Sequence, residues 1–426
     1  MPSPNSNKFL WIILALALAI RVVGAIGLQH WLDGRPGQRF LIEGDANGYW
    51  HLAEDLAAGR EFAIYEPPRY VLRMPGFPAL LSIPIRVFDN AYFPARILLA
   101  CVGTCACGLV YVLGRMLFDH HVGLIAAVLS AISPILVGFT PLILSETTFG
   151  MCLLASLAGM AWMATRSTAR QPDVLTQQSR SVGQFVLMGL VVGALIGITC
   201  YVRPSWLLSA PLFGGAYVMF SPEKGRALVG AACIIAGAVA LLIPWGMRNE
   251  RVTGHFVLTT LWMGPSLYDG LSPEATGESD MTFYDRDNLQ AGGMSEYEVN
   301  RYYSQQAWSF ARANPGRAIE LAAIKVWRYF KPWPNAEQFG GWLPSVVIAA
   351  FTIPMYLLAL RGWWVSRTNV WAWGLTVGPL LYFAGLHMLF VSSLRYRLPA
   401  EYPLLVMSAV GWQSLRGHQS IPQNPT

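Results

Sequence analysis

Several charged residues stand at the edges of apolar runs, where a side chain can reach water beside a membrane. The first is Asp45, in the sequence Glu-Gly-Asp-Ala-Asn-Gly-Tyr at 43–49, directly after the first apolar run. Four more lie at similar edges further along: Glu146, Arg203, Arg248 and Arg395. A carboxylate in such a place can take a proton from a reacting hydroxyl, and an arginine can hold two phosphate oxygens in its planar fork. If all five lie on one side of a membrane, they can form one site.

The composition predicts a membrane protein. Hydrophobic residues make up 54% of the 426 residues and charged residues 13%, and the mean hydropathy is +0.41. Soluble domains of this size do not have that composition. The apolar runs reach the roughly 20 residues that a helix needs to cross a hydrocarbon core. We therefore expect an all-α polytopic membrane protein with about ten transmembrane helices, at 9–29, 92–117, 121–139, 142–164, 183–202, 205–220, 227–246, 340–360, 370–391 and 400–415.

The basic residues of the short loops predict the orientation, because lysine and arginine are retained on the cytoplasmic side. One side collects Lys8, Arg166, Arg170, Arg180, Lys224, Arg226, Arg361, Arg367 and Arg416. The long segments 30–91 and 247–339 then face outward, together with the junctions that carry the charged residues named above. This predicts a site that faces away from the cytoplasm, which in a bacterial inner membrane is the periplasmic side. The net charge of +6 indicates no nucleic-acid partner, since basic residues are expected beside membrane lipids.

The same pattern divides the chain into three parts. Residues 1–246 form an N-terminal transmembrane catalytic core with the first outer segment, about 30–91. Residues 247–339 form a second, helical outer segment, and 340–426 the C-terminal transmembrane helices. The first apolar run begins after a basic residue, but it is too long for a signal peptide and no A-x-A-like cleavage site follows, so we expect an uncleaved anchor.

The outer segments carry helix signals. Apolar residues at helical spacing from Tyr49 to Leu56 predict an amphipathic helix that ends near Gly59, with Asp45 just before it. A second such helix is expected at 77–88. In the larger segment, a capping box at 295–298 opens a helix through about Ala313, and Asn314-Pro315 starts another. The stretch 264–294, rich in Gly, Ser, Asp and Glu, is expected to be a mobile loop.

Other conspicuous residues have structural explanations. Glycines at 189, 193 and 197 share one helix face and predict close approach of a neighbouring helix. The six cysteines have neither zinc-type nor disulfide-framework spacing, so we interpret them as buried thiols in helix packing: Cys101, Cys105, Cys107, Cys152, Cys200 and Cys233. His120-His121 lies in a predicted cytoplasmic loop, where solvated side chains are expected rather than a metal site.

Six motifs together resemble the type C glycosyltransferase superfamily, on the bacterial branch of protein O-mannosyltransferases and the lipid A aminoarabinose transferase. They occur in the expected order over most of the chain: Gly-Asp-Ala-Asn-Gly-Tyr at 44–49, Arg-Met-Pro-Gly-Phe-Pro at 73–78, Leu-Ser-Glu at 144–146, Val-Arg-Pro at 202–204, Pro-Trp-Gly-Met-Arg-Asn at 244–249 and Arg-Tyr-Arg-Leu-Pro at 395–399. The resemblance implies an integral-membrane enzyme that moves a sugar from a polyprenyl-phosphate carrier to a lipid, glycan or protein acceptor on the non-cytoplasmic face.

The resemblance also assigns roles. Asp45 occupies the position of the family's first-loop acid, which takes the acceptor proton or contacts a metal, and Glu146 is a second catalytic candidate. The candidates for binding the donor phosphate are Arg73, Arg203, Arg248, Arg395 and Arg397. Tyr49, in the same motif as Asp45, is assigned to substrate binding.

One departure from the family concerns a metal. Many relatives have a second acid directly after the first-loop aspartate, and this chain has Ala46 there. Glu43 is the nearest substitute. A hard divalent ion such as Mg²⁺ or Mn²⁺ needs several oxygen ligands, so the sequence leaves metal dependence open.

Each site residue also has a structural interpretation. An arginine at a helix end can extend its charge to the lipid headgroups, and Asp45 can cap its helix. Glu146 can simply pair with an arginine, although acids at the edge of a membrane run are usually functional. At the level of the whole protein, a lipid-linked sugar transporter or a polysaccharide polymerase or ligase is the alternative. Transporters tend to have repeated halves and mid-membrane sites, and the sequence has no such repeat.

Overall fold

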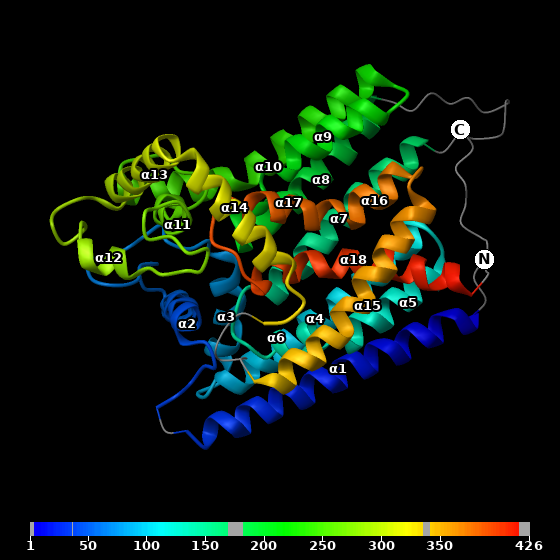
Figure 1. Cartoon of the computed structure of the whole chain (residues 1–426), viewed down its shortest axis with the longest axis horizontal. Helices are drawn as coiled ribbons and strands as arrows, with labels where there is room; N and C mark the ends of the chain where they lie inside the picture. Colours follow the sequence, from blue (N-terminus) through cyan, green and yellow to red (C-terminus); the bar gives the residue numbers. More distant parts are fainter. Residues whose placement is uncertain (1–3, 36, 169–181, 335–340, 417–426) are drawn as a thin grey trace.

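The computed structural model describes residues 4–35, 37–168, 182–334 and 341–416. These residues form helices joined by turns, with no β-strand among them (Figure 1). The described part of the chain is therefore all-α, as the sequence predicts. A bundle of this kind satisfies every backbone hydrogen bond within a segment, which a hydrocarbon environment demands.

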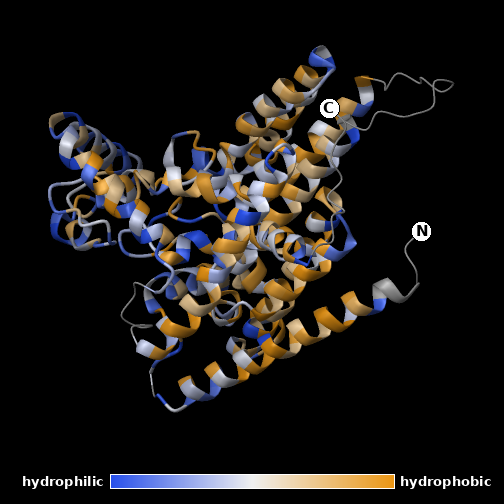
Figure 2. Cartoon of the chain, turned by 45° about the vertical axis from the view of Figure 1, so that its right-hand side comes forward, coloured by the Kyte–Doolittle hydropathy of each residue, from blue (hydrophilic) through white to orange (hydrophobic). Residues whose placement is uncertain are grey.

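Six of the described helices are long and apolar enough to cross a membrane. They are α1 (Pro4–Asp33), α4 (Tyr92–Leu117), α7 (Glu146–Thr168), α8 (Val182–Val202), α10 (Lys224–Thr253) and α15 (Trp342–Ser366). Most residues along the length of the bundle are hydrophobic, whereas hydrophilic residues are more frequent towards its ends (Figure 2). The chain is a multi-pass membrane protein.

Of the other four predicted spans, three are broken into two helices and one is a single helix. They consist of α5 (His120–Ile132) with α6 (Pro134–Phe139), η1 (Pro204–Trp206) with α9 (Ser209–Phe220), α16 (Val370–Thr376) with α17 (Gly378–Leu386), and α18 (Leu394–Leu415). Prolines explain two of the breaks, since Pro134 and Pro379 lie in the first turn of α6 and α17 and lack the N–H that would continue the preceding helix. Pro204 instead begins η1, after the end of α8. The last helix is continuous, and it begins six residues earlier than its predicted span.

Helix α18 lies at the centre of the bundle, where it contacts α4, α5, α7, α15 and α17. Nearly all its residues from 397 to 411 are buried. Protein rather than lipid therefore surrounds the charges at its N-terminal end, which explains why a helix that carries Arg395, Arg397 and Glu401 can stand in a membrane bundle.

Glycines bring α8 and α10 together as predicted. A side-chain carbon added at Gly189, Gly193 or Gly197 would lie within 3.0 Å of α10 atoms. Small residues at such positions let two membrane helices pack backbone against backbone. All six cysteines are free, but Cys101 and Cys105 are exposed on α4, so the prediction that every cysteine is buried was wrong for these two.

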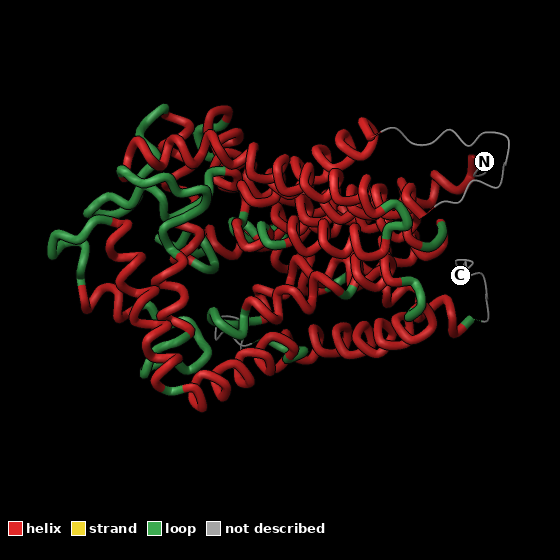
Figure 3. Tube along the Cα trace, turned by 90° about the horizontal axis from the view of Figure 1, so that it is seen from above, coloured by secondary structure: helices red, strands yellow, loops and turns green. Residues whose placement is uncertain are grey.

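The described residues of the two segments predicted to face outward form six helices at one end of the bundle: α2 (Glu43–Ala58), α3 (Gly76–Val87), α11 (Met263–Gly270), α12 (Thr282–Asp287), α13 (Glu296–Ala313) and α14 (Pro315–Phe330). Loops also concentrate at this end (Figure 3). Helix α2 ends at Gly59, which has a positive φ of 68°, as predicted. It begins at Glu43, however, so Asp45 lies in its first turn rather than before it.

The stretch 264–294, which was predicted from its composition to be a mobile loop, contains helices instead. It contains α12 and most of α11, and Phe283 and Tyr284 pack with Val299 and Tyr303 of α13 in a small separate core. The capping box is confirmed, because Ser295 and Glu298 make both of its hydrogen bonds. Asn314 precedes α14 as predicted, but its side chain does not cap that helix.

The basic short connections and the long outer segments lie at opposite ends of the bundle. The start of α1, the α9–α10 turn, the α15–α16 turn and the end of α18 share one end, and α2 with α11–α13 occupies the other (Figure 1). Arg170 and Arg180, which the sequence places on the cytoplasmic side, lie outside the described residues. The observed separation is the arrangement that the loop charges require.

We predict that the end carrying α11–α13 faces away from the cytoplasm. Ala291 and Lys224 are both exposed and lie in or next to connections at the two ends. In a variant without the exposed Cys101 and Cys105, a cysteine at Ala291 should react with an impermeant thiol reagent in intact cells, and a cysteine at Lys224 only after permeabilisation. Reaction of both in intact cells would contradict the predicted orientation.

Candidate active site

Five charged side chains from separate elements meet towards the end of the bundle that carries α2 and α11–α13. Asp45 comes from the first turn of α2, and Arg73 from the segment before α3. Glu146 is the first residue of α7, Arg203 follows α8, and Arg395 is in the first turn of α18. All five were predicted from the sequence as site residues. Ion pairs join them into one group, which we call the charged cluster.

Asp45 is held by two arginines. Its Oδ1 pairs with Arg73, and its Oδ2 lies 2.7 Å from Nη1 of Arg395. Burial alone would raise the pKa of the Asp45 carboxyl, but these two guanidinium groups hold the pKa well below its usual range. The side chain is still 29% exposed, so a bound molecule can reach it. Asp45 does not cap α2, since the N-cap position is Ile42 and no side chain caps the helix.

Glu146 is the buried centre of the cluster. Only 2% of its side chain is exposed, and its Oε1 accepts hydrogen bonds from Arg395 and from Nη2 of Arg203, the latter at 2.6 Å. Its other oxygen, Oε2, is buried and has no hydrogen-bond partner among the residues that the structure describes. Arg395 therefore bridges the two carboxylates, and Glu146 joins Arg395 to Arg203.

A polar and aromatic layer supports the arginines. Ser145 accepts a hydrogen bond from Nε of Arg203 at 2.8 Å, and its hydroxyl lies 3.2 Å from the hydroxyl of Tyr49. The guanidinium of Arg73 lies over the Tyr49 ring, 4.9 Å from its centroid, which is a favourable cation–π distance. Tyr49 is buried, so its observed role is to support Arg73 and Ser145. Ser145 lies in the Leu-Ser-Glu motif, but no role for its hydroxyl was predicted from the sequence.

Close backbone contacts at two glycines bring the elements of the cluster together. A side-chain carbon at Gly76 would lie 2.6 Å from the carbonyl oxygen of Tyr201, so the start of α3 can reach the end of α8 only because residue 76 is glycine. Similarly, a side-chain carbon at Gly150 of α7 would lie 2.8 Å from the Tyr402 ring of α18. These contacts place Arg73 beside Arg203, and Glu146 beside Arg395.

Two of the five predicted phosphate-binding arginines have other partners. Arg248 donates hydrogen bonds to the carbonyl oxygens of Tyr70 and Phe62, at 2.6 and 2.8 Å. Arg397 is fully buried, pairs with Glu401 at 2.6 Å and donates to the carbonyl oxygen of Tyr329 at 2.7 Å. The structure therefore does not bring Arg248 and Arg397 into the charged cluster.

Another buried arginine was not among the predicted site residues. Arg21 lies within α1, is fully buried, and donates hydrogen bonds to the carbonyl oxygens of Ala17 and Ser130, at 3.1 and 3.0 Å. Ser130 is close to the end of α5, whose last carbonyl groups have no partner within that helix. The signal in the sequence is a lone charge inside an apolar run.

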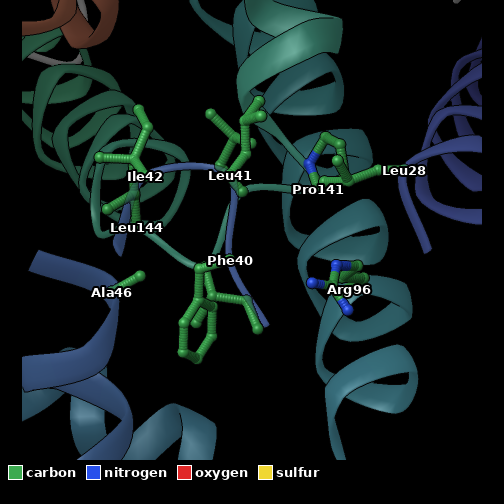
Figure 4. A pocket seen from close by; sticks show the side chains of 10 residues that line it. Leu28, Phe40, Leu41, Ile42, Ala46, Arg96, Pro141 and Leu144 are labelled. Atoms are coloured by element: carbon green, nitrogen blue, oxygen red, sulfur yellow. The ribbon is translucent and has the colours of Figure 1, made fainter. Parts of the chain in front are cut away.

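A small apolar pocket adjoins the charged cluster. It lies between the segments 40–46 and 141–144, and Arg96 is its only charged lining residue (Figure 4). Ala46 and Leu144, which also line it, neighbour Asp45 and Ser145 in the chain. This packing holds the start of α2 against the segment that leads into Glu146.

The described residues do not fit a divalent cation. No group of three or more His, Cys, Asp or Glu side chains is placed to hold a metal in the described part of the chain. Both oxygens of Asp45 face arginines, and Glu146 offers one oxygen that is not already bonded. Hard cations prefer six or more oxygen ligands, and three neighbouring arginines would repel them.

Comparisons with solved structures identify the fold. The chain is similar to the archaeal oligosaccharyltransferase AglB from Archaeoglobus fulgidus in complex with an inhibitory peptide and a dolichol-phosphate, with a TM-score of 0.59, 14% identity and 97% of this chain covered. The apo form of the Archaeoglobus fulgidus oligosaccharyltransferase gives a TM-score of 0.59, 15% identity and 97% coverage. This chain spans only 50% of the length of either oligosaccharyltransferase chain.

A further match is ArnT from Cupriavidus metallidurans bound to undecaprenyl phosphate, with 14% identity over 96% of this chain and 78% of that one, but its TM-score of 0.41 is too low to establish a shared fold. No protein-family model matches the chain, and neither does any curated protein sequence. At this level of identity, the likeness to the oligosaccharyltransferase shows a shared fold alone, and it selects no branch of the superfamily that the motifs resemble.

Proposed function

We propose that this protein is an integral-membrane glycosyltransferase that moves a sugar from a polyprenyl-phosphate carrier to an acceptor on the non-cytoplasmic side. The observation that carries the proposal is the charged cluster at the outer end of the bundle. It combines an accessible carboxylate with three arginines, in a fold like that of an oligosaccharyltransferase. A lipid carrier can reach such a site from the membrane, and a hydroxyl acceptor can reach it from water.

The arginines suit the leaving group. Three arginines against two carboxylates leave the cluster with one net positive charge, which favours an incoming anion. As the bond between the sugar carbon and the phosphate oxygen breaks, its electron pair remains on the phosphate. Fixed guanidinium groups can bind that growing charge in a bidentate manner. We assign this role to Arg73, Arg203 and Arg395.

Asp45 suits the acceptor. The acceptor hydroxyl oxygen forms the new bond to the sugar carbon and loses its proton, which a positioned carboxylate can take. Asp45 is the more exposed of the two acids, at 29% against 2% for Glu146. In the free protein its pKa is held low by arginines. A phosphate that binds those arginines shares their charge, and this raises the basicity of Asp45 when the donor is in place.

Glu146 suits a positioning role better than direct proton transfer. It is buried and bonded to Arg203 and Arg395, so it fixes two phosphate-binding groups relative to Asp45. The acceptor remains open among lipid, glycan and protein, as does the sugar. The outer position of the cluster favours an enzyme over a transporter, whose site is expected near the middle of the membrane.

Binding of a polyprenyl phosphate tests the proposal. Arg203→Ala should weaken binding roughly tenfold or more, because a charge-assisted contact to phosphate is worth about 1.5–3 kcal/mol. Arg203→Lys should restore only part of the affinity, because lysine lacks the planar fork. The measurement is a titration of purified protein in detergent or nanodiscs.

Arg60→Ala is the matched control. Arg60 also lies in the first outer segment, but it pairs with Asp55 and is 58% exposed, so its loss should leave affinity unchanged. Equal affinities of wild type and Arg203→Ala would instead indicate that Arg203 only holds Glu146.

A further inference from the structure

The backbone just before Arg73 is bound by a carboxylate from the second outer segment. Glu296 lies in the first turn of α13 and accepts hydrogen bonds from the backbone N–H groups of Tyr70 and Val71, at 2.9 and 3.1 Å. The carbonyl oxygen of Val71 accepts a further bond from the N–H of Leu261 at 2.9 Å. Both peptide groups are thus held by residues about 190 or more positions away in the chain.

The guanidinium of Arg248 binds carbonyl oxygens of the same region of backbone. It donates to Tyr70 at 2.6 Å and to Phe62 at 2.8 Å. Tyr70 therefore has its N–H on Glu296 and its C=O on Arg248. We call Glu296 and Arg248 the backbone clamp.

Side chains around the clamp hold the neighbouring residues. Gln290 donates to the carbonyl oxygen of Pro68 at 3.1 Å and accepts from Nε of Arg69 at 3.2 Å. The Arg69 guanidinium lies 4.2 Å from the centroid of the Tyr284 ring. The segment 68–71 is therefore docked on the second outer segment, and Arg73 follows after only one more residue.

The burial of Glu296 distinguishes it from an ordinary helix-start acid. It is 8% exposed, and burial raises the pKa of its carboxyl, although the two backbone N–H groups favour the charged form. A buried carboxylate is unfavourable unless its oxygens are bonded. Here its bonds are to main-chain N–H groups whose position decides where Arg73 lies.

We propose that Glu296 is a positioning residue, which holds Arg73 in the charged cluster by binding the Tyr70 and Val71 peptides together with Arg248. The inference rests on the proposed function, because it gives Arg73 its role at the donor phosphate. It also couples the second outer segment to the donor site: a displacement of α13 moves the backbone that carries Arg73. Two residues of chain span less than about 7 Å, so the displacement cannot be absorbed in between.

The test is a double-mutant cycle on polyprenyl-phosphate affinity. Glu296→Gln replaces one acceptor oxygen with an N–H₂ group that cannot accept a backbone N–H, so affinity should fall roughly tenfold through loss of Arg73 from its place. Arg73→Ala should weaken binding by at least as much. Combining the two changes should add nothing to the effect of Arg73→Ala, because Glu296 acts only through Arg73.

Glu298→Gln is the matched control. Glu298 lies in the same turn of α13 and makes the capping-box bonds to Ser295, but it is exposed and touches neither Tyr70 nor Val71. The Glu298→Gln variant should bind polyprenyl phosphate with the affinity of the wild-type protein. If Glu296→Gln does not fold, Arg248→Gln can replace it, because this change removes the hydrogen bond to the Tyr70 carbonyl oxygen. The double-mutant cycle is then measured between Arg248→Gln and Arg73→Ala.

The outcomes separate this inference from the proposed function. Wild-type affinity in Glu296→Gln with weakened binding in Arg73→Ala would overturn the clamp alone. Additive losses in the double variant would also overturn it, because Glu296 would then act independently of Arg73. No binding of polyprenyl phosphate by the wild-type protein, or full affinity in Arg73→Ala, would contradict the donor assignment itself.

Discussion

Asp45→Asn will transfer sugar at least about a hundredfold more slowly than the wild-type protein, if Asp45 takes the acceptor proton. Asparagine has the size of aspartate and accepts a hydrogen bond, but it cannot take a proton. The variant should insert in the membrane, fold and still bind the donor lipid, because Arg203 and Arg395 keep their ion pairs with Glu146. Turnover of a polyprenyl-phosphate sugar by purified protein at saturating donor is the measurement.

Glu43→Gln is the matched control for Asp45→Asn. Glu43 is an exposed acid in the same first turn of α2, and it takes no part in the ion pairs of the charged cluster. Removal of its charge changes the helix start without touching the proposed base, so the rate should be close to that of wild type. Near-normal turnover in Asp45→Asn would remove Asp45 from the mechanism, and Glu146 would be the next acid to test.

Glu146→Gln will lower stability by about 3–5 kcal/mol, because it leaves a largely buried arginine without its carboxylate. Within the described part of the chain, Arg203 pairs with no carboxylate except Glu146, whereas Arg395 also pairs with Asp45. The uncompensated charge of Arg203 is then the main source of the loss. Thermal unfolding of the purified variant in detergent, followed beside the wild type, measures it.

A second substitution separates charge from packing. Glu146→Gln combined with Arg203→Gln removes both charges, so the double variant should be more stable than Glu146→Gln alone. A destabilisation of the double variant equal to the sum of both single changes would contradict the ion-pair explanation. An unchanged melting temperature in Glu146→Gln would show that the buried acid is not what holds the arginines.

The membrane character and the all-α fold could be predicted from local properties of the chain. Long apolar runs determine membrane-length helices, because a hydrocarbon environment leaves the backbone no other partner. Capping boxes and glycine ends are equally local, and those at Ser295 and Gly59 lie where they were predicted. Breaks at Pro134 and Pro379 were readable too, but composition alone merged the pieces into single spans.

The candidate site was predicted as a set of residues but not as an arrangement. Motifs singled out Asp45, Arg73, Glu146, Arg203 and Arg395, and the structure joins all five. The same reasoning placed Arg248 and Arg397 with them, because an arginine at the edge of an apolar run looks alike whether it faces a ligand or a backbone carbonyl. Their partners, Tyr70 and Tyr329, lie 178 and 68 positions away, and no local pattern records such a pairing.

The sequence by itself thus determined the membrane helices, the separation of basic connections from outer segments, and the chemical types available at one end. These follow from the transfer of apolar and charged groups between water and lipid, which each segment undergoes largely on its own. Tertiary structure alone decided which acid is exposed and which is buried, which arginines form the charged cluster, and that Glu296 holds the backbone before Arg73. Those properties depend on distances between segments remote in the chain, and close packing at positions such as Gly76 and Gly150 sets those distances.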